Sequence, residues 1–210
     1  MAAIKTAPLQ ELPAVLENAK AAGRIPLLLD ASKSKVDTFF QYSNGQLLEG
    51  KWLVKLQIDK KPEEEIKEYM RGKLVNAMKY GQVLAIAMTN TAANLAGYFD
   101  PAYFPQEVFT DQATFLKEEN FMKVTRKPDT ADTAGLFIVH KDFQVVVTSH
   151  FAVEDATEFL ADSLPLSSMD IIGIQSDWVD KTMNMNMNMN MGDSNTSYVR
   201  RIALTVKAFS

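Results

Sequence analysis

Short apolar runs alternate with amphipathic stretches along the first 90 residues of the chain. Residues 25–31 and 82–89 are apolar runs bounded by polar residues, a pattern typical of strands that are covered on both faces. Residues 51–59, KWLVKLQID, also predict a strand. Apolar residues at helical spacing predict three helices, over residues 8–23, 34–45 and 62–81. Helix and strand therefore alternate, which predicts an α/β fold with a mostly parallel sheet.

The pattern is less regular in the second half of the chain. Residues 94–122 are rich in aromatics and prolines and predict short helices or turns. Residues 135–151 predict two strands joined at residues 140–142, or one hairpin that feeds a central strand. A short helix over residues 153–164 and a strand over residues 169–175 follow. Together these elements predict a sheet of about five strands with helices on both faces.

The chain divides into three parts by composition. Residues 1–178 form the predicted α/β domain. Residues 179–197 contain an alternation of Met and Asn that ends in small polar residues, which predicts a low-complexity linker. Residues 198–210 form a strand-like tail, which could fold back as an edge strand or pair with another protein.

Composition narrows the classes of function. The chain contains no cysteine, which excludes disulfides, thiolate metal sites and a cysteine nucleophile. Its formal charge of -4 comes from interspersed acids and bases, so we expect neither nucleic acid nor a membrane as partner. No secretory leader and no apolar run of membrane-spanning length is visible, so we expect a cytoplasmic protein.

The turn after the first apolar run has the layout of a phosphate-binding loop. Such a loop uses glycines to wrap backbone N–H groups around phosphates, but no glycine lies between Gly23 and Gly45. The neighbouring strand ends in Thr89 and Asn90, where an acidic residue would be needed for magnesium. We therefore expect a degenerate loop that does not bind nucleotide. Its candidate residues are Asp30, Ser32, Lys33, Ser34 and Lys35.

Three stretches then carry a resemblance to a known family. GRIPLLLDASKSKVDTFFQY, NAMKYGQVLAIAMTN and DFQVVVTSHFAVEDATEFLADSLPLSSMDIIGI resemble, in order and spacing, the degenerate fifth AAA+ module of dynein heavy chains. They are also similar to the C-terminal domain of IQ-motif and ankyrin-repeat proteins. The resemblance covers roughly residues 9–175. It implies a P-loop NTPase-like three-layer sandwich with a mostly parallel sheet.

The resemblance assigns roles to four residues. Asp30 matches the aspartate after the first strand, and Asn90 matches the asparagine after the third. Phe143 and Thr148 match the strand that ends at the nucleotide side in active relatives, which makes Thr148 sensor-like.

The chain also departs from the family pattern. Ala31 stands where the family has proline, and Thr89 where it has glutamate. Residues 152–159 replace an asparagine-proline stretch, and the helical lid is lacking because Gln175 leads directly toward the Met and Asn repeat. The resemblance thus implies a P-loop-like scaffold without ATPase activity.

Two functions follow as expectations. The first is a catalytically inactive, AAA-like structural or interaction protein of the ciliary or flagellar axoneme. It would have no catalytic residue, metal or cofactor, and its partners would be proteins of axonemal or microtubule-associated assemblies. The alternative is a nucleotide-binding switch or weak P-loop NTPase that uses Lys33, Ser34 and Lys35.

Other polar and aromatic groups predict less specific chemistry. His140 and His150 flank a predicted strand without a third ligand at metal spacing, so we expect structural histidines. Ser149 and His150 are neighbours on a strand and should point to opposite faces, which argues against a catalytic triad. An aromatic cluster is expected in the core, although a docking surface is also open: Tyr98, Phe99, Tyr103, Phe104 and Phe109.

Overall fold

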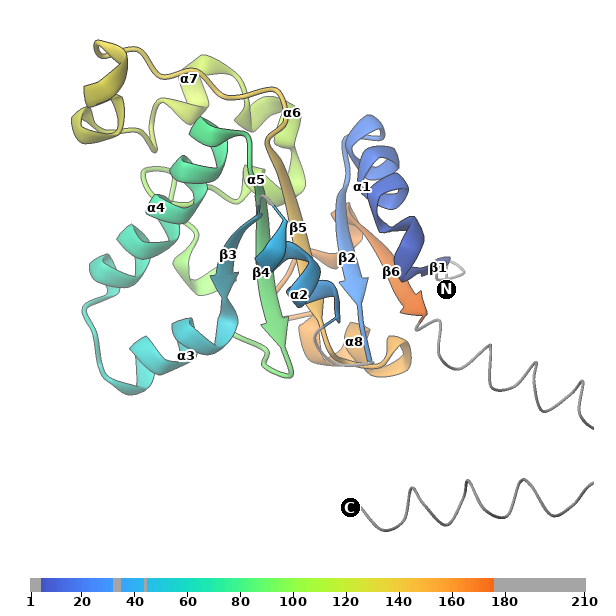
Figure 1. Cartoon of the computed structure of the whole chain (residues 1–210). Helices are drawn as coiled ribbons and strands as arrows, with labels where there is room; N and C mark the ends of the chain where they lie inside the picture. Colours follow the sequence, from blue (N-terminus) through green and yellow to red (C-terminus); the bar gives the residue numbers. More distant parts are fainter. Residues whose placement is uncertain (1–4, 32–34, 44, 176–210) are drawn as a thin grey trace, which may run out of the picture. The chain divides into compact units, whose positions relative to one another are not determined.

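The computed structural model describes residues 5–31, 35–43 and 45–175 (Figure 1). The predicted linker over 179–197, the strand-like tail over 198–210 and the region where a helical lid would follow all lie outside these described residues.

Six strands form one sheet in which every neighbouring pair is parallel. The order across the sheet is β1-β6-β2-β5-β4-β3. The prediction of an α/β fold with a parallel sheet is therefore confirmed. The strands are β1 (Lys5–Pro8), β2 (Ile25–Leu29), β3 (Gly45–Glu49), β4 (Val83–Thr89), β5 (Gln144–Ser149) and β6 (Met169–Gln175).

Helices cover both faces of the sheet. The α-helices are α1 (Leu12–Ala21), α2 (Lys35–Tyr42), α3 (Gly50–Ile58), α4 (Glu63–Tyr80), α5 (Glu107–Thr110), α6 (Gln112–Phe115), α7 (Glu118–Phe121) and α8 (Val153–Leu160). The 3-10 helices are η1 (Leu9–Glu11), η2 (Ala96–Tyr98), η3 (Lys127–Thr133) and η4 (Leu166–Ser168).

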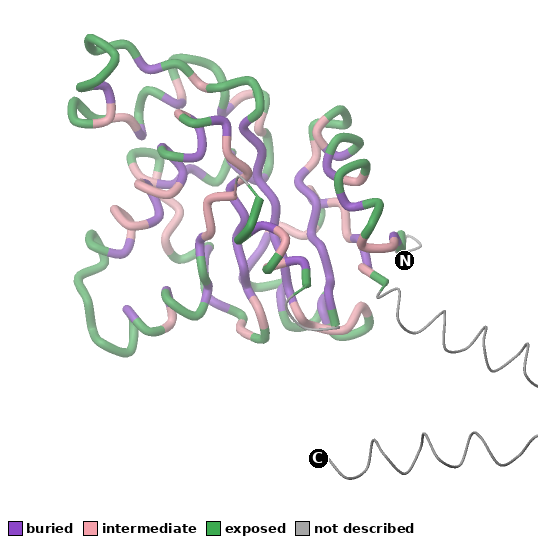
Figure 2. The backbone as a smooth tube through the Cα atoms, viewed as in Figure 1, coloured by how far each residue is buried: buried purple, intermediate pink, exposed green. Residues whose placement is uncertain are grey.

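The two faces of the sheet belong to two separate apolar clusters. Leu28 of β2 packs with α1 and α2 on one face, whereas Leu27 and Leu29 pack with α3 and α4 on the other. This alternation follows from the period of two along a strand. Because both faces are covered, the central strands are buried along most of their length (Figure 2).

The prediction of a strand over residues 51–59 is wrong. These residues form most of α3, and the strand lies just before it, at β3. Leu53 and Leu56 are buried while Lys51 and Lys55 are exposed, which is helical spacing. In KWLVKLQI the same apolar residues fit either period, and the preceding strand takes the place in the sheet.

The prediction of two strands within residues 135–151 is also wrong in part, because only one strand, β5, forms there. Phe137 is buried against Phe121, with 6.0 Å between ring centroids, while Leu136 and Ile138 are exposed. The alternation of buried and exposed residues in this segment thus comes from packing outside the sheet. The sheet also contains β1, a short edge strand that pairs with β6 and that the sequence did not predict.

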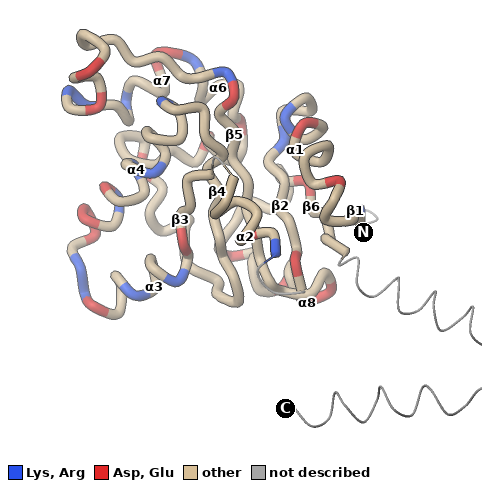
Figure 3. Tube along the Cα trace, in the orientation of Figure 1, with Lys and Arg blue, Asp and Glu red and all other residues tan. Residues whose placement is uncertain are grey.

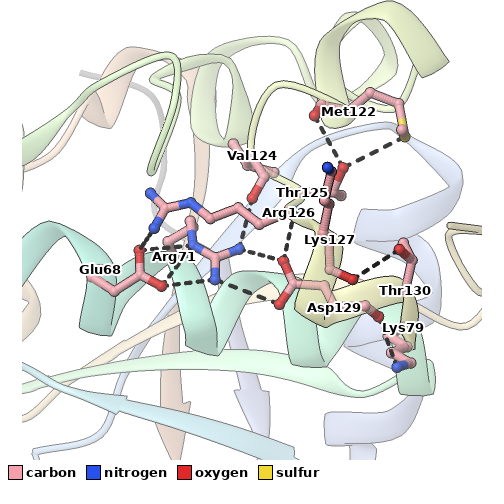
Figure 4. A network of polar contacts seen from close by, with 10 residues as sticks. All are labelled: Glu68, Arg71, Lys79, Met122, Val124, Thr125, Arg126, Lys127, Asp129 and Thr130. Atoms are coloured by element: carbon pink, nitrogen blue, oxygen red, sulfur yellow. Dashed lines mark hydrogen bonds and ion pairs between the residues drawn. The ribbon is translucent and has the colours of Figure 1, made fainter. Parts of the chain in front are cut away.

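The long segment between β4 and β5 packs against α4 and is held there by charged groups (Figure 4). Arg71 of α4 is buried and donates to the carbonyl oxygen of Val124 at 2.8 Å and to Asp129 at 2.6 Å. Its guanidinium also pairs with Glu68 at 2.7 Å. Burial alone would lower the pKa of Arg71, but the hydrogen bonds to Glu68 and Asp129 raise it above its ordinary value.

A second contact between this segment and α4 predicts acid sensitivity. The N–H of Ala102 and the ammonium of Lys67 lower the pKa of Asp100. A depressed pKa stabilises the fold above the unfolded value, and that stability is lost as pH falls through the folded pKa. We therefore expect Asp100→Asn to be less stable than the wild type at pH 7 and to differ little from it at a pH well below the folded pKa of Asp100. Urea unfolding at both pH values measures this, with exposed Asp59→Asn as control.

Among the described residues, no helix combines the length and the apolar character needed to cross a membrane.

Candidate functional site

The candidate site lies where β2, β4 and β5 end, at the carboxyl edge of the parallel sheet. This edge is where open α/β sheets place their ligands. Asp30 follows β2 directly and is buried. Its carboxylate accepts a hydrogen bond from the N–H of Val36 in the first turn of α2, at 3.0 Å. Its own N–H donates to the carbonyl oxygen of Ser149 at 2.8 Å, which ties the end of β2 to the end of β5.

A second carboxylate, Asp37, connects α2 to the end of β5. The Thr148 hydroxyl donates to Asp37 at 2.5 Å. The Nε2 atom of His150 lies 2.8 Å from the other carboxylate oxygen of Asp37. The side chains of Asp37 and His150 are only 15% and 9% exposed, so this pair is largely shielded from water. The cluster therefore fixes the first turn of α2 against the end of β5.

Thr89, the last residue of β4, adopts a left-handed backbone conformation with φ of 54°. This is costly for a β-branched residue. Its carbonyl oxygen accepts from the N–H of His150 at 2.8 Å and from the hydroxyl of Ser149 at 3.2 Å. Within the described part of the chain, its buried hydroxyl has no hydrogen-bond partner. The turn after β4 is thus held in a strained form by the end of β5.

The structure brings some of the predicted site residues together. Asp30 and Thr148 both contact α2: the Asp30 carboxylate accepts from the N–H of Val36, and the Thr148 hydroxyl donates to the carboxylate of Asp37. Lys35 is the first residue of α2 and is exposed. Ser32, Lys33 and Ser34 lie outside the described residues.

Other predicted residues lie elsewhere along the strands. Phe143 precedes β5, at the end opposite Thr148, and is buried in the apolar core. His140 also lies at that far end, where its backbone N–H donates to the carbonyl oxygen of Met78 at 2.8 Å. Asn90 follows β4 directly. The two histidines are thus at opposite ends of β5.

Sequence reasoning missed Asp37 and the role of His150. The signal was present in the period of two, since Thr148 and His150 are two residues apart and can contact the same group. Ser149 lies between them, and its hydroxyl bonds to the carbonyl oxygen of Thr89 rather than to His150. A partner on a separate helix, such as Asp37, cannot be identified from local spacing.

Hollows lie beside α2, and neither is lined by the carboxyl ends of β2, β4 and β5. One, of about 510 Å³, is lined by Leu9, Lys35, Phe39 and Tyr42 among others. The next, of about 300 Å³, lies between α1 and α2 and shares Phe39 with the first. Among the described residues, no group of three or more His, Cys, Asp or Glu side chains could hold a metal ion.

Comparisons with known proteins found no family model, no curated protein and no solved structure that matches the chain.

The buried carboxylate of Asp30 yields a prediction about α2. We expect Asp30→Ala to lower the free energy of unfolding by about 1–2 kcal/mol, since it removes the acceptor for a first-turn N–H. Asp30→Asn keeps an acceptor oxygen and should cost less. Chemical denaturation of both variants measures the difference; equal losses would mean that the negative charge, rather than the hydrogen bond, stabilises α2.

Proposed function

We propose that the chain is a catalytically inactive, AAA-like module that acts by binding other proteins. The sheet supports this hypothesis. With the edge strand β1 set aside, the remaining strands run in the order β6-β2-β5-β4-β3. Counted along the chain from β2, this is the order 5-1-4-3-2, an all-parallel arrangement that is compatible with the P-loop-like sandwich that the resemblance implies. The loop candidate then follows β2, which is the first strand in this count and lies between β6 and β5.

One observation carries the proposed loss of nucleotide chemistry. In a working phosphate loop, the phosphates accept hydrogen bonds from backbone N–H groups at the N-terminus of the following helix. In this chain the Asp30 carboxylate accepts from the N–H of Val36 at that position. Asp37 adds a second carboxylate in the same turn. A polyphosphate would have to displace one buried anion and approach another, which opposes its binding.

The finer part of the proposal concerns where the module acts. The resemblance to the fifth AAA+ module of dynein heavy chains supports a place in the ciliary or flagellar axoneme, among axonemal or microtubule-associated proteins. Fractionation of ciliated cells tests it. We expect the protein in isolated axonemes, and its presence in the cytosol with absence from axonemes would overturn this placement.

Thermal unfolding with and without magnesium-ATP or magnesium-GTP tests the absence of nucleotide binding. A ligand that binds the folded state raises the melting temperature by mass action. We expect no rise at millimolar nucleotide. A rise that disappears in the double variant Lys33→Ala/Lys35→Ala would overturn the proposal and favour the nucleotide-binding switch.

A further inference from the structure

The exposed side of α3 combines lysines with large apolar side chains. Lys51, Lys55 and Ile58 are spaced at i, i+4 and i+7, so they lie along one face of the helix, and all are exposed. Ile58 is 74% exposed, and Trp52 beside them is 39% exposed. Lys60 follows in the turn after the helix. These five residues are called the α3 patch.

Among the described residues, no acidic side chain forms an ion pair with the lysines of this patch. Within the described residues, Lys51, Lys55 and Lys60 form no ion pair; Lys55 instead lies over the Trp52 ring, 4.8 Å from its centroid. The nearest acids in sequence are Glu49, two residues before Lys51, and Asp59, next to Lys60. The acids in the first turn of α4 have other partners: Glu63 pairs with Lys67, Glu64 with Tyr103 and Glu65 with Lys61.

We propose that the α3 patch is a docking surface for an acidic segment of a partner protein that also carries apolar side chains. The inference rests on the proposed interaction function and names the chemistry of the partner. Lysines without an ion pair supply a local positive charge, and Figure 3 marks basic positions along α3. Trp52 and Ile58 supply apolar contact area, and Trp is among the residues that contribute most to binding at interfaces.

Charge favours an acidic peptide over a membrane or a nucleic acid. The whole chain carries a net charge of -4, which opposes approach to an extended anionic surface. A short acidic segment feels mainly the charges within a Debye length of about 8–10 Å. The apolar face of α3 is moreover committed to the core through Leu53 and Leu56, so α3 cannot insert that face into a bilayer.

Fluorescence anisotropy of a labelled peptide, EELEELEEL, titrated with the full chain tests the proposal. We expect binding that weakens as salt rises and that falls by about tenfold in the triple variant Lys51→Glu/Lys55→Glu/Lys60→Glu. The matched control, Lys117→Glu/Lys127→Glu/Lys141→Glu, makes the same change of net charge at exposed lysines elsewhere and should bind like the wild type. The basic peptide KKLKKLKKL should not bind at the patch.

Contrary results are equally specific. An equal loss of affinity for the acidic peptide in both triple variants, or no binding of this peptide by the wild type, overturns the proposal. Binding of vesicles that contain phosphatidylserine, lost only in the α3 variant and without peptide binding, would replace it with a membrane surface. If the α3 triple variant fails to fold by circular dichroism, Lys51→Gln/Lys55→Gln takes its place. Because the nucleotide measurement is separate, failure of this site and failure of the proposed function remain distinguishable.

Discussion

Replacing Arg71 with alanine is expected to lower the free energy of unfolding by about 3–5 kcal/mol. The guanidinium is 7% exposed and bonds to two carboxylates and one carbonyl oxygen. Its removal leaves Asp129 without this cation. The side chain of Asp129 is only 17% exposed, so water can replace the lost partner only in part. Removal of the guanidinium also leaves the carbonyl of Val124 without this donor. Urea unfolding followed by circular dichroism measures the loss.

Two further variants separate the buried charge from the surface charge. Arg71→Lys keeps the charge but cannot reproduce the forked geometry, so an intermediate loss is expected. Arg126 pairs with Glu68 at 2.6 Å but is 41% exposed, and Arg126→Ala should cost no more than about 1 kcal/mol. An Arg71→Ala loss as small as that of Arg126→Ala would mean that the network does not anchor the segment between β4 and β5.

The sequence predicts the parallel core because its signals there agree with one another. β2 and β4 are continuous apolar runs, and α4 begins after Pro62 with three glutamates and ends at Gly81. Gly81 has φ of 64°, and its position is closely approached by His140, so a side chain there would clash. The start signal, the stop signal and the apolar period of α4 all predict a helix, and the apolar runs on either side predict the strands of the core.

Where the period is ambiguous, sequence reasoning fails for a physical reason. The sequence of α3 predicts a strand because apolar and polar residues alternate over residues 54–58, and only the burial of Leu53 and Leu56 distinguishes the helix. β1 is too short to give a pattern and forms only by pairing with β6. Long-range pairing is therefore the part that local spacing could not provide.

The candidate site shows the same division. The prediction of a degenerate loop rests on its missing glycines, and the resemblance to the AAA+ module singled out Asp30 and Thr148. The role of Asp30 at the N-terminus of α2 depends on a folded turn, and the contact of His150 with Asp37 joins residues 113 positions apart. The first contact has no sequence signature, and for the second the spacing of Thr148 and His150 indicates a shared face but not the partner, Asp37.

The second large effect is expected from Phe104→Ala, with a loss of about 3–5 kcal/mol. Phe104 is fully buried, and its ring centroid lies 5.9 Å from that of Phe109 and 6.5 Å from that of Phe99. Alanine would leave a cavity among these aromatics. Phe104→Leu fills most of the space and should cost clearly less, while Tyr42→Ala, at an 84% exposed side chain, should change stability by less than about 0.5 kcal/mol.

This experiment decides between the two hypotheses for the aromatic cluster. A docking surface would tolerate truncation, because its side chains contact solvent in the free protein. A core position would not, and its loss should appear as one cooperative transition at lower denaturant, since Phe104 belongs to the same apolar cluster as β4 and β5. A separate early transition would instead show that the segment between β4 and β5 unfolds on its own. The bonds of Arg71 to Val124 and Asp129 and the packing of Phe104 would then be too weak to couple this segment to the sheet.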